Sequence, residues 1–564
     1  IVDLVDKMSG EVVMTVADVL TVFRATPEAM RDCCLWILIL GFFLAFIMAM
    51  AIGANDVANS FGTSVGSKVL SLRTAFVLAT IFEILGASLI GYKVSDTVRK
   101  GIFNVSMYEG SEKELMLGSL SALTGSAIWQ FIATFFKLPV SGTHSIVGAT
   151  IGFTVVARGT HGIQWIMLAK IVGSWFISPI LSGIISAAFF SCILKFIIKK
   201  EDSITPGLKF LPFVYGFTLL VNVFSIVNDG PALLYLDRVP LWGSIVISLG
   251  VGLLAAIVVQ FALVPWMRRR MAEVSQNPTP ERSRAISMEE LPISVVSETA
   301  LDTFDEKVSL DREEVMEFTN GHATLDHETH SIHGRSDVKS KKYAQIPSLV
   351  VCPSAASVGI KSNSSQLPLV EKSGVLEQLE EERLKGAGEE EADKPEVGKL
   401  FSFLQILTAI FGSFAHGGND VSNAIGPLIA LWLVYHEGSV EQTSETPLYI
   451  LMFGGVGISL GLWVWGKRVI ETVGKDLTKI TPSSGFTIEI GAAFTVLVAS
   501  KIGLPISTTH CKVGSVVFVG WVKSSKTGVD WSLFRNIVIA WVVTVPFTAL
   551  CSAAVMAVLR AVAL

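Results

Sequence analysis

Two polar motifs occur twice in this chain, in the same order and at almost the same separation, and each copy lies within apolar sequence. Residues 53–62 read GANDVANSFG, and residues 417–426 read GGNDVSNAIG. A second motif follows each, LPVSGTH at 138–144 and LPISTTH at 504–510. Many membrane proteins with internal repeats build one central site from two such halves. The pattern therefore predicts an internally duplicated membrane protein.

The composition supports a membrane protein. Hydrophobic residues make up 51% of the chain and charged residues only 16%, where soluble domains carry about 25% charged residues. Apolar runs of about 20 residues, enough to cross a bilayer, recur along the sequence. They cover 34–52, 73–92, 113–136, 165–198, 211–227, 241–265, 400–416, 448–466, 486–503 and 531–560. The prediction is an all-α polytopic membrane protein of about ten to twelve transmembrane helices, with two repeats and broken or re-entrant helices.

Charge divides the chain into regions. Residues 32–266 form a first transmembrane block with the first motif copies, and residues 400–564 form a second block with the other copies. Between them, residues 267–399 are rich in Ser, Glu and Lys, which predicts a large disordered loop. Residues 1–31 lack a clear signal peptide and their role is open. The basic residues form no stripe for nucleic acid, and the scattered cysteines suggest neither a disulfide framework nor a metal site.

Basic clusters predict the orientation. Arg268, Arg269 and Arg270 follow one apolar run, and Lys199 and its neighbours lie two runs earlier, so both clusters face one side. The positive-inside rule makes that side, and the disordered loop with it, cytoplasmic. The sequon at Asn104 lies in a polar loop and is a glycosylation candidate if that loop is outside.

The first motif concentrates side-chain oxygens within one helical turn. Asn55 and Asn59 are four residues apart and share a helix face. Glycines around both copies, and Pro427 after the second, favour a broken helix that would free backbone carbonyls. Such oxygens suit a hard cation such as Na⁺. The predicted sodium ligands are Asn55, Asp56, Asn59, Asn419, Asp420 and Asn423.

The alternative for this motif is close helix packing through small residues, with the amides as interhelical hydrogen-bonding groups. That explains the glycines and alanines. It leaves unexplained an aspartate that costs about 2.5–3.5 kcal/mol at a bilayer centre and that occurs twice in the same context.

The second motif predicts an anion site. Pro139 and Pro505 can start a half-helix, after which hydroxyls and backbone N–H groups lie at a helix amino end, where the dipole favours negative charge. Ordinary N-capping is the alternative. Capping requires only one such residue per copy, whereas each copy has more. The predicted phosphate-binding residues are Ser141, Gly142, Thr143, Ser507, Thr508 and Thr509.

Five further polar residues are candidates for transport coupling. Glu83 and Glu489 sit inside apolar runs, where an ionisable group suggests function, although a position nearer the interface would be an ordinary explanation. Gln130 is a third intramembrane polar residue. His144 and His510 end the second motif copies and either tune or protonate the ligand, or only cap a turn.

At these motifs the chain resembles the inorganic phosphate transporter family, and in particular the animal type III sodium-dependent phosphate cotransporters. The resemblance covers about 32–266 and 400–564. It implies a plasma-membrane symporter of sodium and monovalent phosphate, with two inverted repeats and a long cytoplasmic loop. It also implies both termini outside and often a homodimer. Some members serve as retrovirus receptors, so a viral envelope glycoprotein is an implied partner. Glu83, Glu489 and both motif serines match family positions tied to transport.

These expectations make the chain a transporter rather than an enzyme, with no cofactor and with Na⁺ as the coupling ion. Four alternatives stay open. Ser141 with His144, or Ser507 with His510, could form the nucleophile and base of a membrane hydrolase. The chain could be a non-transporting receptor or sensor. Sulfate could replace phosphate, and a proton could replace sodium.

Overall fold

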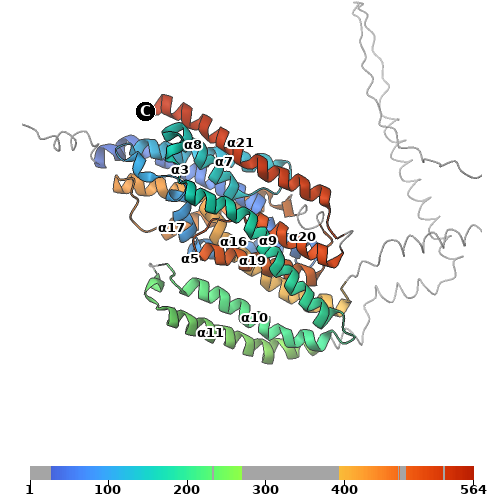
Figure 1. Ribbon diagram of the computed structural model, residues 1–564. Coiled ribbons are helices and arrows are strands. Elements are labelled where there is room, and N and C mark those ends of the chain that lie inside the picture. The colour runs from blue at the N-terminus through green and yellow to red at the C-terminus, as the bar shows by residue number, and fades with distance from the viewer. Residues whose placement is uncertain (1–26, 232–233, 270–392, 468, 471–477, 525–527) are drawn as a thin grey trace, which may run out of the picture. The chain divides into compact units, whose positions relative to one another are not determined.

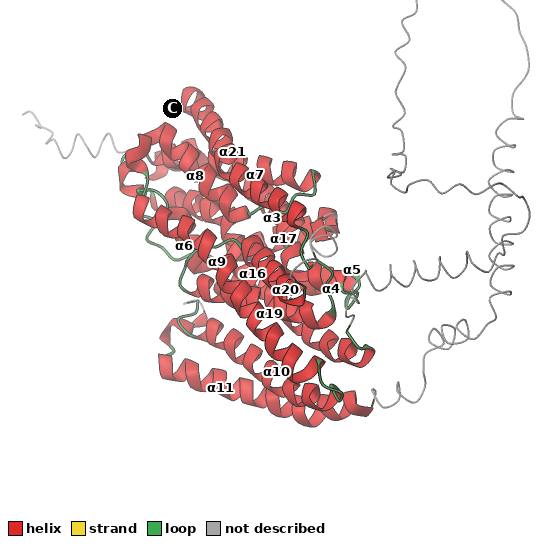
Figure 2. Cartoon of the chain, turned by 45° about the vertical axis from the view of Figure 1, so that its right-hand side comes forward, coloured by secondary structure: helices red, strands yellow, loops and turns green. Residues whose placement is uncertain are grey.

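The computed structural model describes residues 27–231, 234–269, 393–467, 469–470, 478–524 and 528–564. Most of the predicted N-terminal segment and of the predicted disordered loop, residues 1–26 and 270–392, lie outside the described residues. The described part is built of helices (Figure 2). Ten of its helices are long and apolar enough to cross a membrane, as an all-α polytopic fold requires. This confirms the predicted fold class.

Each repeat consists of packed helices that include one hairpin. Two further helices connect the repeats in sequence and lie side by side along the lower edge of the bundle in Figure 1. The first repeat contains α3 (Pro27–Asp56), α4 (Ala58–Gly66), α5 (Leu72–Ile90), α6 (Tyr92–Lys100), α7 (Glu112–Phe135), α8 (Gly142–Arg158) and α9 (Trp165–Ile193). The second contains α16 (Pro395–Glu437), α17 (Leu448–Trp465), α19 (Pro482–Lys501), α20 (Thr508–Lys523) and α21 (Trp531–Ala563). The connecting pair is α10 (Ile204–Val227) and α11 (Leu241–Val258).

The predicted break in the motif helix occurs in one copy only. In the first copy, α3 ends at Asp56 and α4 begins at Ala58. In the second, α16 is continuous through the motif and through Pro427, so the predicted break there is wrong. A proline removes one intrahelical hydrogen bond, and here the turns on both sides of Pro427 are buried among neighbouring helices that hold the helix together.

The hairpins return to the side from which they start. Arg158 at the end of α8 pairs with Glu114 at the start of α7 (2.5 Å). Thr478, before α19, donates a hydrogen bond to the carbonyl of Gly528, after α20 (2.6 Å). Because the first hairpin makes no net crossing, four crossings, by α5, α9, α10 and α11, separate the end of α3 from the start of α16, so α16 begins on the side where α3 ends. The chain therefore enters the second repeat from the opposite side, which makes the repeats inverted.

The same connectivity places the basic clusters. Asn104 is exposed, and its backbone N–H donates to the carbonyl of Gly162 (2.9 Å), just before α9. Lys200 follows the other end of α9, and α10 and α11 bring Arg268 back to that side. The basic residues therefore share one side and Asn104 lies on the other. Which side is cytoplasmic stays a prediction.

The repeats exchange partners across their interface. Helix α5 of the first repeat packs on α16, and α17 of the second packs on α3 and α5. Likewise α8 packs on α21 and α20 on α9. Between α3 and α17 the contact depends on two glycines. Gly53 lies against the carbonyl of Ile458, and Gly461 lies against the carbonyl of Met50.

Gly461→Ala is expected to lower the amount of folded protein at the cell surface several-fold, because a Cβ there would overlap the Met50 carbonyl oxygen and force α3 and α17 apart. Surface biotinylation measures the change. Gly250→Ala in α11 is the matched control, since a Cβ there meets no atom within 4 Å and alanine is the better helix former. Wild-type surface levels for Gly461→Ala would contradict the predicted close packing.

Candidate functional site

Asn55 fastens the end of α3 to the loop between α7 and α8. Its Nδ2 donates hydrogen bonds to Thr134 Oγ1 (3.0 Å) and to the carbonyl of Leu138 (2.9 Å). Its Oδ1 accepts a hydrogen bond from the backbone N–H of Val140 (3.1 Å). The amide of this predicted sodium ligand is therefore engaged with the protein, and its position fixes the chain just before the second motif.

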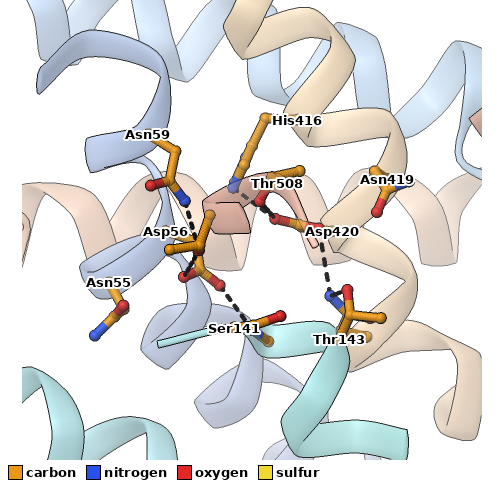
Figure 3. Close-up of polar contacts among 12 residues, drawn as sticks. Asn55, Asp56, Asn59, Ser141, Thr143, His416, Asn419, Asp420 and Thr508 are labelled. Atoms are coloured by element: carbon orange, nitrogen blue, oxygen red, sulfur yellow. Dashed lines mark hydrogen bonds and ion pairs between the residues drawn. The ribbon is translucent and has the colours of Figure 1, made fainter. Parts of the chain in front are cut away.

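Asp56 places a buried carboxylate at the start of α8. Its Oδ2 accepts a hydrogen bond from the backbone N–H of Gly142 (3.3 Å), and its Oδ1 accepts one from Thr509 Oγ1 (3.5 Å). Asn59 Nδ2 donates to the same Thr509 hydroxyl (2.9 Å). The first motif of one repeat thus meets the second motif of both repeats (Figure 3).

Asp420 repeats this arrangement from the middle of α16. Its Oδ2 accepts a hydrogen bond from Thr508 Oγ1 (2.5 Å). Asn423 Nδ2 lies 3.5 Å from Asp420 Oδ1 and donates across the interface to Thr143 Oγ1 (3.3 Å). Figure 3 shows these side chains in one group with Asp56. The structure therefore brings the predicted sodium ligands and phosphate-binding residues of both copies together.

The two loops before α8 and α20 cross each other. Thr143 Oγ1 donates a hydrogen bond to the carbonyl of Ile506, and Thr509 Oγ1 donates one to the carbonyl of Val140, both at 2.9 Å. The Asn419 amide lies 3.0 Å from the Ile506 carbonyl, much as its counterpart in α3 holds the other loop. Each repeat therefore positions the helix start of the other.

Ser141 and Ser507 are the N-caps of α8 and α20. Their hydroxyl oxygens accept hydrogen bonds from the backbone N–H groups of His144 (3.3 Å) and His510 (3.1 Å). This is the capping role that the sequence left open. It is compatible with anion binding, because a hydroxyl that accepts a hydrogen bond can still donate its own hydrogen. A nucleophile and its base would require contact between the serine hydroxyl and an imidazole ring. Here the hydroxyl oxygens contact backbone N–H groups of the two histidines and not their rings.

Polar groups closely surround Gly142. A Cβ on this residue would stand 3.0 Å from Asp56 Oδ2, 3.1 Å from Asn423 Nδ2 and 3.3 Å from Gln130 Nε2. Both amide atoms of Gln130 and the Oδ1 of Asn423 are buried and make no hydrogen bond within the described residues. Buried polar groups almost always have partners, so this cluster is suited to receive a ligand. In the second half Thr508 stands where Gly142 does.

Glu83 connects to the second motif through a histidine that the sequence reasoning missed. Its carboxylate accepts a hydrogen bond from Ser413 Oγ (2.9 Å) and lies 2.8 Å from His416 Nδ1. The other ring nitrogen, Nε2, is 2.9 Å from Asp420 Oδ2. His416 thus bridges two buried carboxylates. Its position four residues before Asp420, on the same helix face, was the available signal.

Glu489 lies in a cluster of hydroxyl groups. Its carboxylate accepts hydrogen bonds from Thr63 (2.5 Å), Ser64 (2.6 Å) and Thr408 (2.7 Å). Lys512, also missed in the sequence, donates to the Thr63 hydroxyl (3.0 Å). Both predicted intramembrane glutamates are therefore buried and close to the motifs.

His144 and His510 form an aromatic column with two tryptophans. The ring centres of Trp175 and His144 are 3.7 Å apart, those of the two histidines 4.4 Å, and those of His510 and Trp541 3.7 Å. His510 Nδ1 is 3.0 Å from the carbonyl of Trp175. The structure thus brings the two predicted histidines together with each other at the starts of α8 and α20.

Comparison with known proteins identifies the family. The family model of the phosphate transporter family matches residues 52–552. The chain belongs to the phosphate transporter family. Sodium-dependent phosphate transporter 1-A of Danio rerio is 44% identical, over 93% of this chain and 94% of that protein. Sodium-dependent phosphate transporter 2 of Xenopus tropicalis is also 44% identical, over 93% of this chain and 98% of that protein.

A solved structure described as the sodium-dependent phosphate transporter is 32% identical to this member of the phosphate transporter family. The match covers 93% of this chain and 99% of the solved chain, with a TM-score of 0.67. These similarities confirm the resemblance and the fold. These relatives are transporters rather than enzymes. The hydrolase alternative is therefore set aside.

Proposed function

We propose that this chain is a sodium-coupled symporter of inorganic phosphate. The observation that carries the proposal is the joint position of two buried carboxylates, Asp56 and Asp420, beside the amino ends of α8 and α20. Carboxylate and amide oxygens suit Na⁺, and helix amino ends with hydroxyl groups suit an oxyanion. The relatives are named sodium-dependent phosphate transporters, which supports the same two solutes, sodium and phosphate.

Charge explains why the two solutes would travel together. Phosphate approaching α8 and α20 meets the negative charges of Asp56 and Asp420, which oppose it. Sodium bound to those carboxylates cancels that repulsion, and by linkage phosphate then strengthens sodium binding by the same factor. Gly142 and Thr143 would contact phosphate beside Asp56, and Thr508 and its neighbours would do so beside Asp420.

Monovalent phosphate fits this site best, because a second negative charge would add to the repulsion by two buried carboxylates. Two sodium ions with one monovalent phosphate carry one net positive charge inward. The membrane potential then contributes about 2.3 kcal/mol per 100 mV. Alternating access follows if the two inverted repeats rock around the crossed loops.

The family resemblance carries the finer proposals. They are a location in the plasma membrane, glycosylation at Asn104, a homodimer and binding of a viral envelope glycoprotein. Exposure of Asn104 on the side opposite Lys200 supports glycosylation. Outward-facing apolar side chains on α11, such as Leu253 and Leu254, are suited to contact with lipid.

Uptake of labelled phosphate in cells expressing the chain tests the function. Replacing sodium by choline is expected to remove the uptake, and Asp420→Asn and Ser507→Ala are each expected to reduce it at least tenfold at equal surface expression. Asp237→Asn, in an exposed loop, and Ser402→Ala, whose hydroxyl donates to the Gly398 carbonyl of its own helix, are the controls. Uptake equal to that of mock cells for the surface-expressed wild type would refute phosphate transport, and labelled sulfate would then be tried.

A further inference from the structure

The two halves of the site differ at positions that the repeat makes equivalent. His416 in α16 corresponds to Ile52 in α3, and Lys512 in α20 corresponds to Ile146 in α8. Both buried basic residues therefore belong to the second repeat, and each lies near one of the two glutamates. The imidazole of His416 contacts Glu83 of the first repeat directly (2.8 Å). The ammonium of Lys512 lies near Glu489 of its own repeat.

Lys512 and Glu489 are joined through one hydroxyl group. Lys512 Nζ donates a hydrogen bond to Thr63 Oγ1 (3.0 Å), and Thr63 Oγ1 donates one to Glu489 Oε1 (2.5 Å). Lys512 and Glu489 are each 2% exposed. A buried charge without an opposite charge nearby is strongly unfavourable. The ammonium and the carboxylate therefore stabilise each other inside the protein.

The same two residues line a small cavity next to the proposed transport site. Its lining includes Asn59, Ser60, His416, Glu489, Thr508 and Lys512. The cavity volume is about 20 Å³, where one water molecule needs about 10–15 Å³, so the space fits a single small particle and not a phosphate. The Glu489 carboxylate is surrounded by hydroxyl oxygens, which with a carboxylate form a donor set that suits Na⁺.

We propose that Lys512 is a tethered cation that stands in for a sodium ion in the second half of the site. Its ammonium supplies the positive charge that the Glu489 carboxylate requires, so sodium cannot also bind there. The carrier consequently binds one sodium ion fewer than the Glu489 cluster would allow without the lysine. This inference rests on the proposed sodium coupling.

Equilibrium binding of ²²Na⁺ to the purified full-length protein tests the inference. Lys512→Met removes the charge and keeps a long side chain, and Ile146→Met places the same residue at the equivalent position of the first repeat. We expect Lys512→Met to bind one more sodium ion per protein than the wild type, and Ile146→Met to bind the wild-type number. Melting temperature in sodium and in choline medium gives a second readout, with a larger sodium-dependent increase expected for Lys512→Met.

The outcomes separate the two proposals. A wild-type protein that binds no sodium would refute sodium coupling itself. A wild type that binds sodium, with the same number in Lys512→Met, would overturn the role of Lys512 alone. If Lys512→Met yields folded protein in sodium medium but not in choline medium, the result supports Lys512 as a tethered cation. Two variants matter if folding fails, Lys512→Met alone and Lys512→Met combined with Glu489→Gln. If both failed to fold in sodium as well as in choline, sodium could not replace the ammonium, and the inference would be overturned.

Discussion

Gly142→Ala is expected to lower phosphate uptake strongly while the protein still reaches the surface. The added Cβ would stand 3.0–3.3 Å from one polar atom each of Asp56, Asn423 and Gln130, and would push these groups apart. Overpacking a closely fitted position typically costs about 1–3 kcal/mol, which, applied to binding at this site, corresponds to a loss in affinity of roughly five- to 150-fold. Labelled phosphate uptake, normalised to surface protein, measures the effect.

Gly173→Ala in α9 is the control for this variant, because it adds the same methyl group to a transmembrane helix with no atom within 4 Å. It should transport at the wild-type rate. If Gly142→Ala transported equally well, the polar cluster around Gly142 would not bind a transported solute, and the proposed site would have to lie elsewhere.

His416→Ala is expected to destabilise the protein and to eliminate uptake. The imidazole lies between the Glu83 and Asp420 carboxylates, at 2.8 and 2.9 Å. Its removal leaves these two acidic groups buried without their shared partner, and breaking a buried ionic contact in this way costs about 3–5 kcal/mol. Thermal unfolding of the detergent-purified protein and phosphate uptake measure the two effects.

A second variant distinguishes stability from transport. Adding Glu83→Gln to His416→Ala removes one of the two acidic groups, so it should recover part of the stability and none of the uptake. His161→Ala, at an exposed position, should behave as the wild type. Recovery of uptake together with stability in the double variant would show that His416 serves only to keep the protein folded.

The repeat and the membrane spans could be predicted because they depend on local sequence. Long apolar runs have few other structures available, and the duplicated motifs indicated which residues would be polar inside the membrane. Continuity of α16 could not be predicted in this way. Pro427 breaks an isolated helix, whereas here α16 continues through it, packed among neighbouring helices, and the sequence does not show those contacts.

Other features of the site depend on contacts between distant parts of the chain. His416 contacts Glu83, which is 333 residues away in the sequence. Lys512 contacts Thr63, which is 449 residues away. Asn55 could be singled out from the motif as a candidate site residue, but only the fold shows that its amide is bound to a neighbouring loop. Pairings of this kind need either a structure or many related sequences.

The crossed loops also bear on how the two repeats evolved. Thr143 and Thr509 are the same residue and make the same contact in opposite directions, as two identical chains inserted in opposite orientations would. In such a pair, positions related by the two-fold axis must carry identical side chains. Gly142 and Thr508 differ, and so do Ile146 and Lys512. These differences could arise only after gene duplication had let the two copies change independently, so the crossed threonines preserve an older symmetry that other parts of the site have since lost.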